Sequence, residues 1–446
     1  MGRAGKILKK IFWIFLLLIF LMGLSLIVLF TLLDVFDEDE SHVSNQKSEL
    51  INKLRKDSAM IKAATSDYDT TVQVIRVSAK ENLDTHFGID EEAGKQKRIF
   101  TGRRINVAVI GVDSRLNTSY KHADANHVVS FLIDNGKIEI TAIPRDTPCD
   151  AGQEDSAQNK LTVLYPARGK RAYLEEVATI AELDRIHYYV EVGFSQAKGI
   201  LELLGFKNSG SALQVLRSRS VLGGNDYQRC YNQAQFIRQM FLKHFEKLTG
   251  FFSEILIRGG LTLVNTNMTY PIVKNIFDKL ERKGFPGSPN DIVIRIRPPL
   301  NIKYKIYDYS DKNVMTNLTD KVESYTVSSS SSYYGDRHRR YKVSDVLWNK
   351  INAALLDSAE RPWEVIAGLK TLFNQRAWLQ MEDVKERDSI REIFAVLLYD
   401  AYLKRNQANK AREVMKIIES EKKLFSIPVF NKSVPRDTSD SNNFHY

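Results

Sequence analysis

Two apolar runs that end in charged residues constrain the fold of this chain more than any other feature. Residues 106–112 run into Asp113, and residues 137–144 run into Arg145. A third strand-like run, residues 128–134, lies between them. Ligands of open α/β sheets bind beyond the carboxyl ends of strands, so acidic and basic groups gathered there predict a site for a metal and a polyanion.

The pattern after these runs alternates between helix and strand. Apolar periodicity predicts helices over residues 172–181, 194–204 and 226–248, and a strand over residues 186–192. Helices that alternate with strands indicate α/β layering. We therefore predict an α/β fold in which a central mixed β-sheet is flanked by helices.

An uninterrupted apolar run covers residues 11–33. About 20 helical residues cross a hydrocarbon core, so we expect a transmembrane helix here. Basic residues precede the run and acidic residues follow it, which places residues 1–10 in the cytoplasm. The expected localisation is the cell membrane, with a single span and the bulk of the chain extracytoplasmic. The alternative, a cleaved signal peptide, has a shorter apolar region and a small-x-small cleavage site.

The net charge of +10 and the pI near 9.2 favour an acidic partner. Nucleic acid, anionic lipid and phosphorylated carriers all qualify on charge alone. The expected extracytoplasmic location argues against nucleic acid.

Changes in composition divide the remaining chain. We expect a stalk or accessory segment over residues 34–104, an α/β domain over 105–300, a strand-like segment and flexible linker over 301–340, an α-helical accessory domain over 341–424 and a disordered tail over 425–446. The C-terminal helical region is interpreted as a module that binds a protein partner. A helical cap on the core is the alternative.

Four short motifs carry a resemblance to a known family. They read G-x-D-x-R at residues 111–115, I-P-R-D-T at 143–147, R-S-R at 217–219 and D-Y-Q-R-C-Y-N-Q at 226–233. In this order and spacing, over about residues 106–268, the chain resembles the LytR-CpsA-Psr family. The resemblance implies that the α/β domain is catalytic. It further implies a membrane-anchored phosphotransferase that moves a glycopolymer from a polyprenyl pyrophosphate carrier onto peptidoglycan of the cell wall.

The resemblance also implies roles for individual residues. Mg²⁺ takes hard oxygen ligands, usually one or two carboxylates with phosphate oxygens and water. Arginine forks match the oxygens of a pyrophosphate bidentately. The family's metal-binding positions match Asp113 and Asp124, its pyrophosphate-binding arginines match Arg145, Arg217, Arg219 and Arg229, its accompanying amide matches Gln233, and Arg115 is a further candidate for the carrier.

One segment departs from the family pattern. Relatives commonly show R-S-D-T where this chain has His122, Ala123, Asp124 and Ala125, so one arginine and two hydroxyls are lost. His122 could donate in place of the arginine. A plain surface histidine is the other interpretation.

The implied mechanism depends on electrostatics. Mg²⁺ and the arginines would neutralise the diphosphate while an acceptor hydroxyl displaces the lipid. Asp146 or Asp124 could act as the base, and the residues do not decide between them. Two other functions remain open: a non-catalytic, membrane-tethered binder of lipid pyrophosphate or wall polymer, and a polyprenyl pyrophosphate hydrolase.

The two cysteines, Cys149 and Cys230, fall in the region expected outside the membrane, where a disulfide can persist. The family alignment puts both beside one pocket, so a bridge between its walls is one expectation. Two unpaired thiols are the other.

Overall fold

The computed structural model describes residues 87–113, 116–118, 121–206, 208–219, 222, 225–330 and 342–427. Every element named below belongs to the unit Glu81–Tyr446. The predicted membrane span, most of the predicted stalk, Arg115 and the predicted tail beyond residue 427 lie outside the described residues. No helix within the described residues is long and apolar enough to cross a membrane.

A six-stranded mixed sheet forms the centre of the fold, in the order β6-β5-β2-β3-β4-β7. Its strand β3 is antiparallel to both neighbours, β2 and β4, so β2 and β4 run in the same direction and end at the edge where β3 begins. β5 and β7 pair in parallel with β2 and β4, and β6 pairs antiparallel with β5. The predicted mixed sheet is confirmed. The strands are β2 (Arg104–Asp113), β3 (His122–Leu132), β4 (Lys137–Ile143), β5 (Tyr188–Val192), β6 (Asn265–Thr266) and β7 (Ile292–Ile296).

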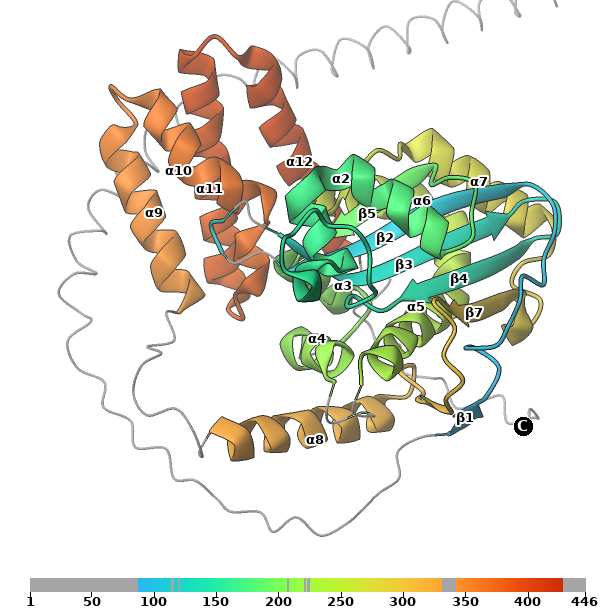
Figure 1. Cartoon of the computed structure of the whole chain (residues 1–446). Helices are drawn as coiled ribbons and strands as arrows, with labels where there is room; N and C mark the ends of the chain where they lie inside the picture. The colour runs from blue at the N-terminus through green and yellow to red at the C-terminus, as the bar shows by residue number, and fades with distance from the viewer. Residues whose placement is uncertain are drawn as a thin grey trace, which may run out of the picture. The chain divides into compact units, whose positions relative to one another are not determined.

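Helices cover both faces of the sheet, as predicted (Figure 1). Alternate residues of a strand point to opposite faces, so Ala108 and Ile110 of β2 pack with helix α2, whereas Val107 packs on the other side. The helices are α2 (Leu161–Ile180) on one face and α5 (Asp226–Thr249), α6 (Ser253–Leu263) and α7 (Tyr270–Arg282) on the other.

Helix α2 begins at Leu161, eleven residues before the predicted start at residue 172. Pro166 lies within it, and Gly169 interrupts its helical geometry with φ +79°. Pro and Gly are the strongest helix breakers, which is why the sequence predicted only the second half. The predicted helix over residues 194–204 is confirmed as α3 (Phe194–Leu203), and Gly205 follows it with φ +91°.

The segment predicted to be strand-like from residue 304 is mostly helical. Only β8 (Tyr304–Ile306) is a strand, which pairs with β1 (Gly88–Asp90), and α8 (Lys312–Ser330) follows. Met315, Leu318 and Val322 are spaced by three and four residues, so they share one helix face and pack in a cluster with α3 and α4 (Ser209–Arg217). The polar, β-branched composition concealed this helical spacing.

The C-terminal region is helical and packs against the core. Its elements are α9 (Val343–Asp357), α10 (Pro362–Asn374), the 3₁₀ turn η3 (Ala377–Gln380), α11 (Val384–Lys404) and α12 (Ala408–Ser426). A Cβ added at Gly199 of α3 would lie 2.8 Å from Leu379, and one at Gly259 of α6 would lie 2.7 Å from Leu424. The close approach of α6 to α12 therefore favours glycine at residue 259, where the added atom would meet the Cβ of Leu424, whereas at Gly199 the end of the Leu379 side chain would have to shift.

The two cysteines are unpaired. Cys149 packs with the cluster on the α2 face of the sheet, whereas Cys230 is buried in the cluster on the opposite face. The sheet separates them, so the structure excludes the bridge that the family alignment suggested.

Candidate functional site

The charged residues predicted from the sequence meet at the edge of the sheet where β2 and β4 end and β3 begins. Asp113 is the last residue of β2, Asp124 is the third residue of β3, and Arg145 follows β4 by two residues. The strand predicted over residues 128–134 thus begins earlier, at His122, and it includes Asp124. The antiparallel course of β3 brings its first residues to the same edge as the ends of its neighbours.

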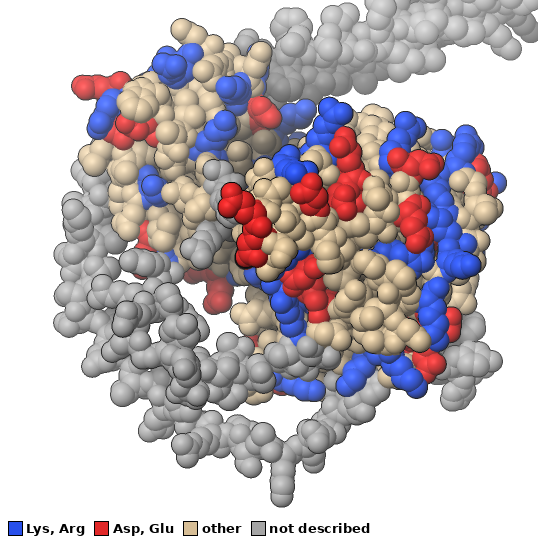
Figure 2. Space-filling view, in the orientation of Figure 1, with Lys and Arg blue, Asp and Glu red and all other residues tan. Residues whose placement is uncertain are grey.

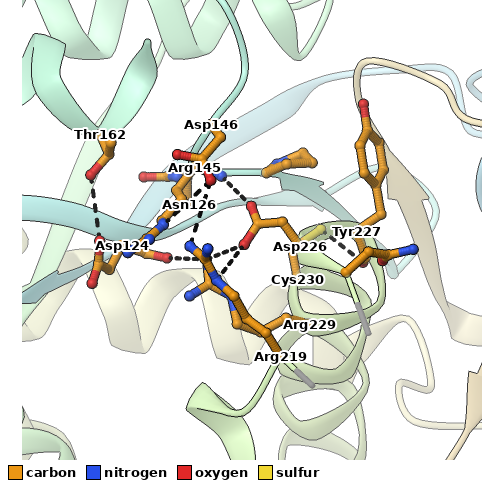
Figure 3. A network of polar contacts seen from close by, with 12 residues as sticks. Asp124, Asn126, Arg145, Asp146, Thr162, Arg219, Asp226, Tyr227, Arg229 and Cys230 are labelled. Carbon is orange, nitrogen blue, oxygen red and sulfur yellow. Dashed lines mark hydrogen bonds and ion pairs between the residues drawn. The ribbon is translucent and has the colours of Figure 1, made fainter. Parts of the chain in front are cut away.

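Asp226, which the sequence reasoning did not assign to the site, lies at the centre of the cluster (Figure 3). Its Oδ2 accepts a hydrogen bond from the backbone N–H of Arg145 at 2.9 Å. Its Oδ1 forms ion pairs with Arg229 Nη2 at 2.5 Å and with Arg219 Nε at 3.4 Å. One carboxylate thus joins three of the predicted arginines.

The start of α5 positions this carboxylate. The side chain of Asn225 caps the helix by accepting from the backbone N–H of Gln228 at 2.7 Å. An acidic residue in the first turn is favoured by the helix dipole, and residues three apart share a helix face. Asp226 and Arg229 therefore project together toward the sheet edge.

Arg229 is the most deeply buried arginine of the cluster, with its side chain 6% exposed. Its Nη2 donates to the backbone oxygen of Asp124 at 3.2 Å, and its buried Nε makes no hydrogen bond. Burial lowers its pKa, Asp226 offsets part of this effect, and the nearby guanidiniums of Arg219 and Arg145 lower the pKa further. A buried cation beside two like charges favours an anionic ligand, because an anion would offset both the lost hydration of the guanidinium and its repulsion from the neighbouring arginines.

Arg145 pairs with one of the predicted metal-binding carboxylates. Its Nη1 donates to Asp124 Oδ1 at 2.8 Å, and Thr162 Oγ1 donates to the same oxygen at 3.4 Å. Burial by itself lowers the pKa of Arg145, but the carboxylates around it, Asp124 foremost, outweigh burial and leave the pKa above its ordinary value. The Nε of Arg145 is buried without a hydrogen-bond partner.

The remaining two arginines are more open to solvent. Arg217 Nη2 lies 3.4 Å from Asp113 Oδ1, and its guanidinium stacks 5.4 Å from the ring centroid of Phe194. Arg219 Nη2 lies 3.6 Å from Asp146 Oδ2. The two arginines and their aspartate partners are all 37–47% exposed. Each ion pair is therefore worth less than about 1 kcal/mol and can exchange for a ligand contact.

An apolar pocket of about 250 Å³ opens at this cluster. Helices α3, α4 and α5 supply its apolar walls, and four of the predicted charged residues line it as well: Asp113, Asp124, Arg217 and Arg229. Apolar wall residues include Ala197, Ile200, Leu213, Leu216, Phe236 and Ile237.

Gln233 and His127 form a polar pair inside the same pocket. Gln233 donates from Nε2 to the backbone oxygen of Leu216 at 3.0 Å, and its Oε1 lies 3.2 Å from His127 Nε2. Burial lowers the pKa of His127 from 6.5 to about 4, so the imidazole is neutral near pH 7. Both functional groups of the Gln233 amide are thus engaged within the protein.

Asp113 and Asp124 are the residues present that suit a hard divalent cation. Both line the pocket where the arginines gather. Within the described residues, no three His, Cys, Asp or Glu side chains are placed to hold a metal by themselves. Two carboxylates completed by phosphate oxygens and water are a normal coordination for Mg²⁺.

The structure thus brings together seven of the eight predicted site residues, and Arg115 lies outside the described residues. Sequence reasoning missed Asp226 and His127, and it did not recognise that Lys160 Nζ lies 3.4 Å from Asp146. The three-residue spacing of Asp226 and Arg229 at a helix start was a signal for the first of these.

One face of the described residues shows charged side chains of both signs. On the face shown in Figure 2, Lys and Arg are interspersed with Asp and Glu. A protein that binds nucleic acid typically presents a basic stripe, so this face gives no support to that interpretation of the positive net charge.

Comparison with known proteins identifies the α/β domain. The model of the LytR_cpsA_psr family matches residues 55–206. The match agrees with the family resemblance that the sequence motifs predicted, although it starts and ends earlier than the motifs indicated. No curated protein matches the chain.

Three of the solved structures that match part of this chain are as follows. Bacillus subtilis TagV is 19% identical, with a TM-score of 0.35, and the alignment covers 50% of this chain and 99% of TagV. The Lin1025 protein of Listeria innocua is 16% identical, with a TM-score of 0.34 and coverage of 49% and 98%. A structure described as TagT bound to LIIa-WTA is 15% identical, with a TM-score of 0.32 and coverage of 51% and 94%.

Proposed function

We propose that the chain is a membrane-anchored phosphotransferase that moves a glycopolymer from a polyprenyl pyrophosphate carrier to peptidoglycan. One observation carries the proposal: two arginines of the cluster, Arg217 and Arg229, line an apolar pocket together with Asp113 and Asp124. The match to the LytR-CpsA-Psr family supports transfer of a wall glycopolymer at the level of the family. The apolar run at residues 11–33 would supply the anchor.

The pocket suits a ligand with an apolar chain and an anionic head. Its walls from α3 and α5 are aliphatic and aromatic, which favours a prenyl chain over a sugar or a nucleotide. Arg229 lines the pocket, and Arg145 pairs with the lining residue Asp124. Each has a buried Nε without a hydrogen-bond partner, and a diphosphate would satisfy both. A prenyl diphosphate therefore accounts for both halves of the site.

Asp113 and Asp124 would hold Mg²⁺ in this proposal. When bound, the ion would neutralise charge on the diphosphate as a Lewis acid. The same two carboxylates are the partners of Arg217 and Arg145. Neutralising them would release both guanidiniums for phosphate, so metal and lipid should bind cooperatively.

The transfer itself is a displacement at phosphorus. A hydroxyl of the acceptor attacks the phosphorus that carries the glycan, the bridging P–O bond breaks, and prenyl monophosphate leaves. The hydroxyl proton passes to a base, for which Asp146 and Asp124 remain the alternatives. Arg145 and Arg229 stabilise the charge that accumulates on the diphosphate oxygens.

Single replacement of Arg145 and of Arg229 by alanine tests this function. Each change removes a donor to the reacting diphosphate, and such losses lower kcat by roughly 100-fold or more. Arg171→Ala is the matched control, because Arg171 is 93% exposed on α2. The assay is magnesium-dependent transfer from a polyprenyl pyrophosphate-linked glycan to peptidoglycan, with the full chain in detergent.

The products separate the alternative functions. Release of free glycan phosphate to water in place of the acceptor would indicate a hydrolase. Donor binding without turnover would indicate a tethered binder. Full activity in both arginine variants would overturn the proposed use of this site.

A further inference from the structure

A second cavity lies beside the apolar pocket, between the α/β core and the C-terminal helices. Its volume is about 560 Å³, within the roughly 300–1,000 Å³ of small-molecule sites. Val112 and Gly193 line both cavities, so a single layer of backbone and side chain separates them. Val112 is followed directly by Asp113, which lies at the arginine cluster.

The walls of this second cavity come from two regions far apart in the sequence. The core contributes Asn265 of β6, and the C-terminal helices contribute Thr371 and Asn374 of α10 and Glu413 of α12. Asn265, Asn374 and Glu413 are exposed. Hydroxyl, amide and carboxylate groups from both sides thus face one space.

The charged groups deeper in the cavity are already paired. Glu191, whose side chain is 3% exposed, forms ion pairs with Lys121 and with Lys170, the latter at 3.0 Å, and accepts from Tyr165 Oη at 2.6 Å. Arg376 donates to the backbone oxygen of Thr262 at 2.8 Å. The cavity therefore lacks the surplus of cations that the arginine cluster presents to a polyanion.

Apolar side chains lie among these polar groups. Leu261, Val264 and Ile417 line the same space. Paired charges, amides, hydroxyls and apolar patches together fit an uncharged ligand that has hydroxyl and amide groups on an apolar ring framework. A sugar residue with an N-acetyl group has this chemistry, because its ring C–H faces are apolar and its edges donate and accept hydrogen bonds.

We propose that this cavity binds an uncharged, N-acetylated sugar residue of the acceptor glycan. The assignment rests on the proposed function, since the sugar residue held here would belong to the same glycan strand whose hydroxyl attacks the diphosphate. It also gives the C-terminal helices a role in the site: they form the second wall of the acceptor cavity. Acceptor and donor then occupy neighbouring cavities on either side of Val112.

Blocking the cavity tests the proposal. Asn374→Phe places a large ring in the cavity from the end of α10, at an exposed position that tolerates the change. Glu413→Trp does so from α12, and serves if the first variant does not fold. Lys370→Phe is the matched control, because Lys370 is an exposed residue of α10 outside the cavity lining.

Two titrations with the full chain in detergent separate this proposal from the proposed function. The first uses di-N-acetylchitobiose as the acceptor probe, and the second uses a short-chain prenyl diphosphate with Mg²⁺. We expect each blocking variant to weaken chitobiose binding at least tenfold while its prenyl diphosphate affinity stays within twofold of the control. The transfer assay should show the same change as a higher KM for the acceptor.

The outcomes are distinguishable. Absence of chitobiose binding by the unmodified chain, or unchanged binding in both blocking variants, would overturn the acceptor site and leave the donor site standing. An equal loss of both ligands would also overturn it, because the change would then act on the whole fold. Loss of prenyl diphosphate binding in Arg229→Ala with chitobiose binding retained would support two separate sites.

Discussion

Replacing Asp226 with asparagine should lower the stability of the protein and at the same time strengthen diphosphate binding. Asparagine keeps an oxygen that can accept from the backbone N–H of Arg145, which Asp226 accepts at 2.9 Å. The charge is lost, so the guanidiniums of Arg229 and Arg219 lose their shared carboxylate. The opposite signs of the two effects make this variant informative.

The cost in stability follows from burial. The Asp226 and Arg229 side chains are 14% and 6% exposed, and removal of one partner from a buried pair costs roughly 3–5 kcal/mol. We expect the lower end, about 3 kcal/mol, because Arg229 keeps its bond to the backbone oxygen of Asp124. The pair with Arg219, which is 37% exposed, adds less than about 1 kcal/mol.

The gain in affinity follows from the same charge. A carboxylate about 6 Å from a bound phosphate opposes it by roughly 3 kcal/mol at an effective dielectric constant of 20. Solvent at Arg219 screens part of this repulsion, so we expect about tenfold tighter binding, roughly 1.4 kcal/mol.

Thermal unfolding with and without a short-chain prenyl diphosphate measures both effects. At roughly 2 °C per kcal/mol the variant should unfold about 6 °C lower than the unmodified chain without ligand. The ligand should raise the unfolding temperature of the variant more than it raises that of the unmodified chain. Glu175→Gln is the control, because Glu175 is 67% exposed on α2. A variant as stable as the unmodified chain, or one stabilised less by the ligand, would refute the reasoning.

Three further predictions concern packing, pH and metal. Leu379→Ala should lower the free energy of unfolding by about 2–5 kcal/mol, because Leu379 is 2% exposed and packs against Gly199; calorimetry that shows less than 1 kcal/mol would contradict the docking of η3 on α3. Burial holds the pKa of His127 at about 4 in the folded chain against 6.5 ordinarily, so the unfolded chain protonates first as the pH falls. The contribution of neutral His127 to the free energy of unfolding is complete above pH 6.5 and is lost between about pH 6.5 and pH 4, by roughly 3 kcal/mol. Denaturant unfolding of His127→Gln should therefore depend less steeply on pH than that of the unmodified chain. Removal of Mg²⁺ with a chelator should weaken prenyl diphosphate binding at least tenfold in the unmodified chain and have little effect in the Asp113→Asn, Asp124→Asn double variant; an equal chelator effect in both would place the metal elsewhere.

The sequence predicted the sheet because local chemistry decides it. The apolar run before Asp113 and the run before Arg145 are long, β-branched and bounded by charge, so they read as buried strands without knowledge of their neighbours. The arginines were predictable for a different reason. Their order along the chain matched a family pattern, and no local property of Arg145 or Arg229 distinguished them from surface arginines.

What the sequence did not predict depends on long-range contacts. Asp226 becomes central only because α5 begins beside the end of β4, which brings it to the backbone of Arg145 across 81 residues. The acceptor cavity needs α10 and α12 to pack beside β6, and no periodicity within those helices indicates that packing. The helix over residues 312–330 was missed because its buried face has only a few apolar residues among polar ones.

The central claim is that one prenyl diphosphate occupies the apolar pocket with its head at the arginine cluster, and a structure of the full chain with a short-chain prenyl diphosphate and Mg²⁺ tests it most directly. The claim predicts phosphate oxygens within hydrogen-bond distance of the Arg145 and Arg229 guanidiniums, and the prenyl chain between α3 and α5. A diphosphate bound away from these arginines, or a prenyl chain outside the pocket, would contradict it.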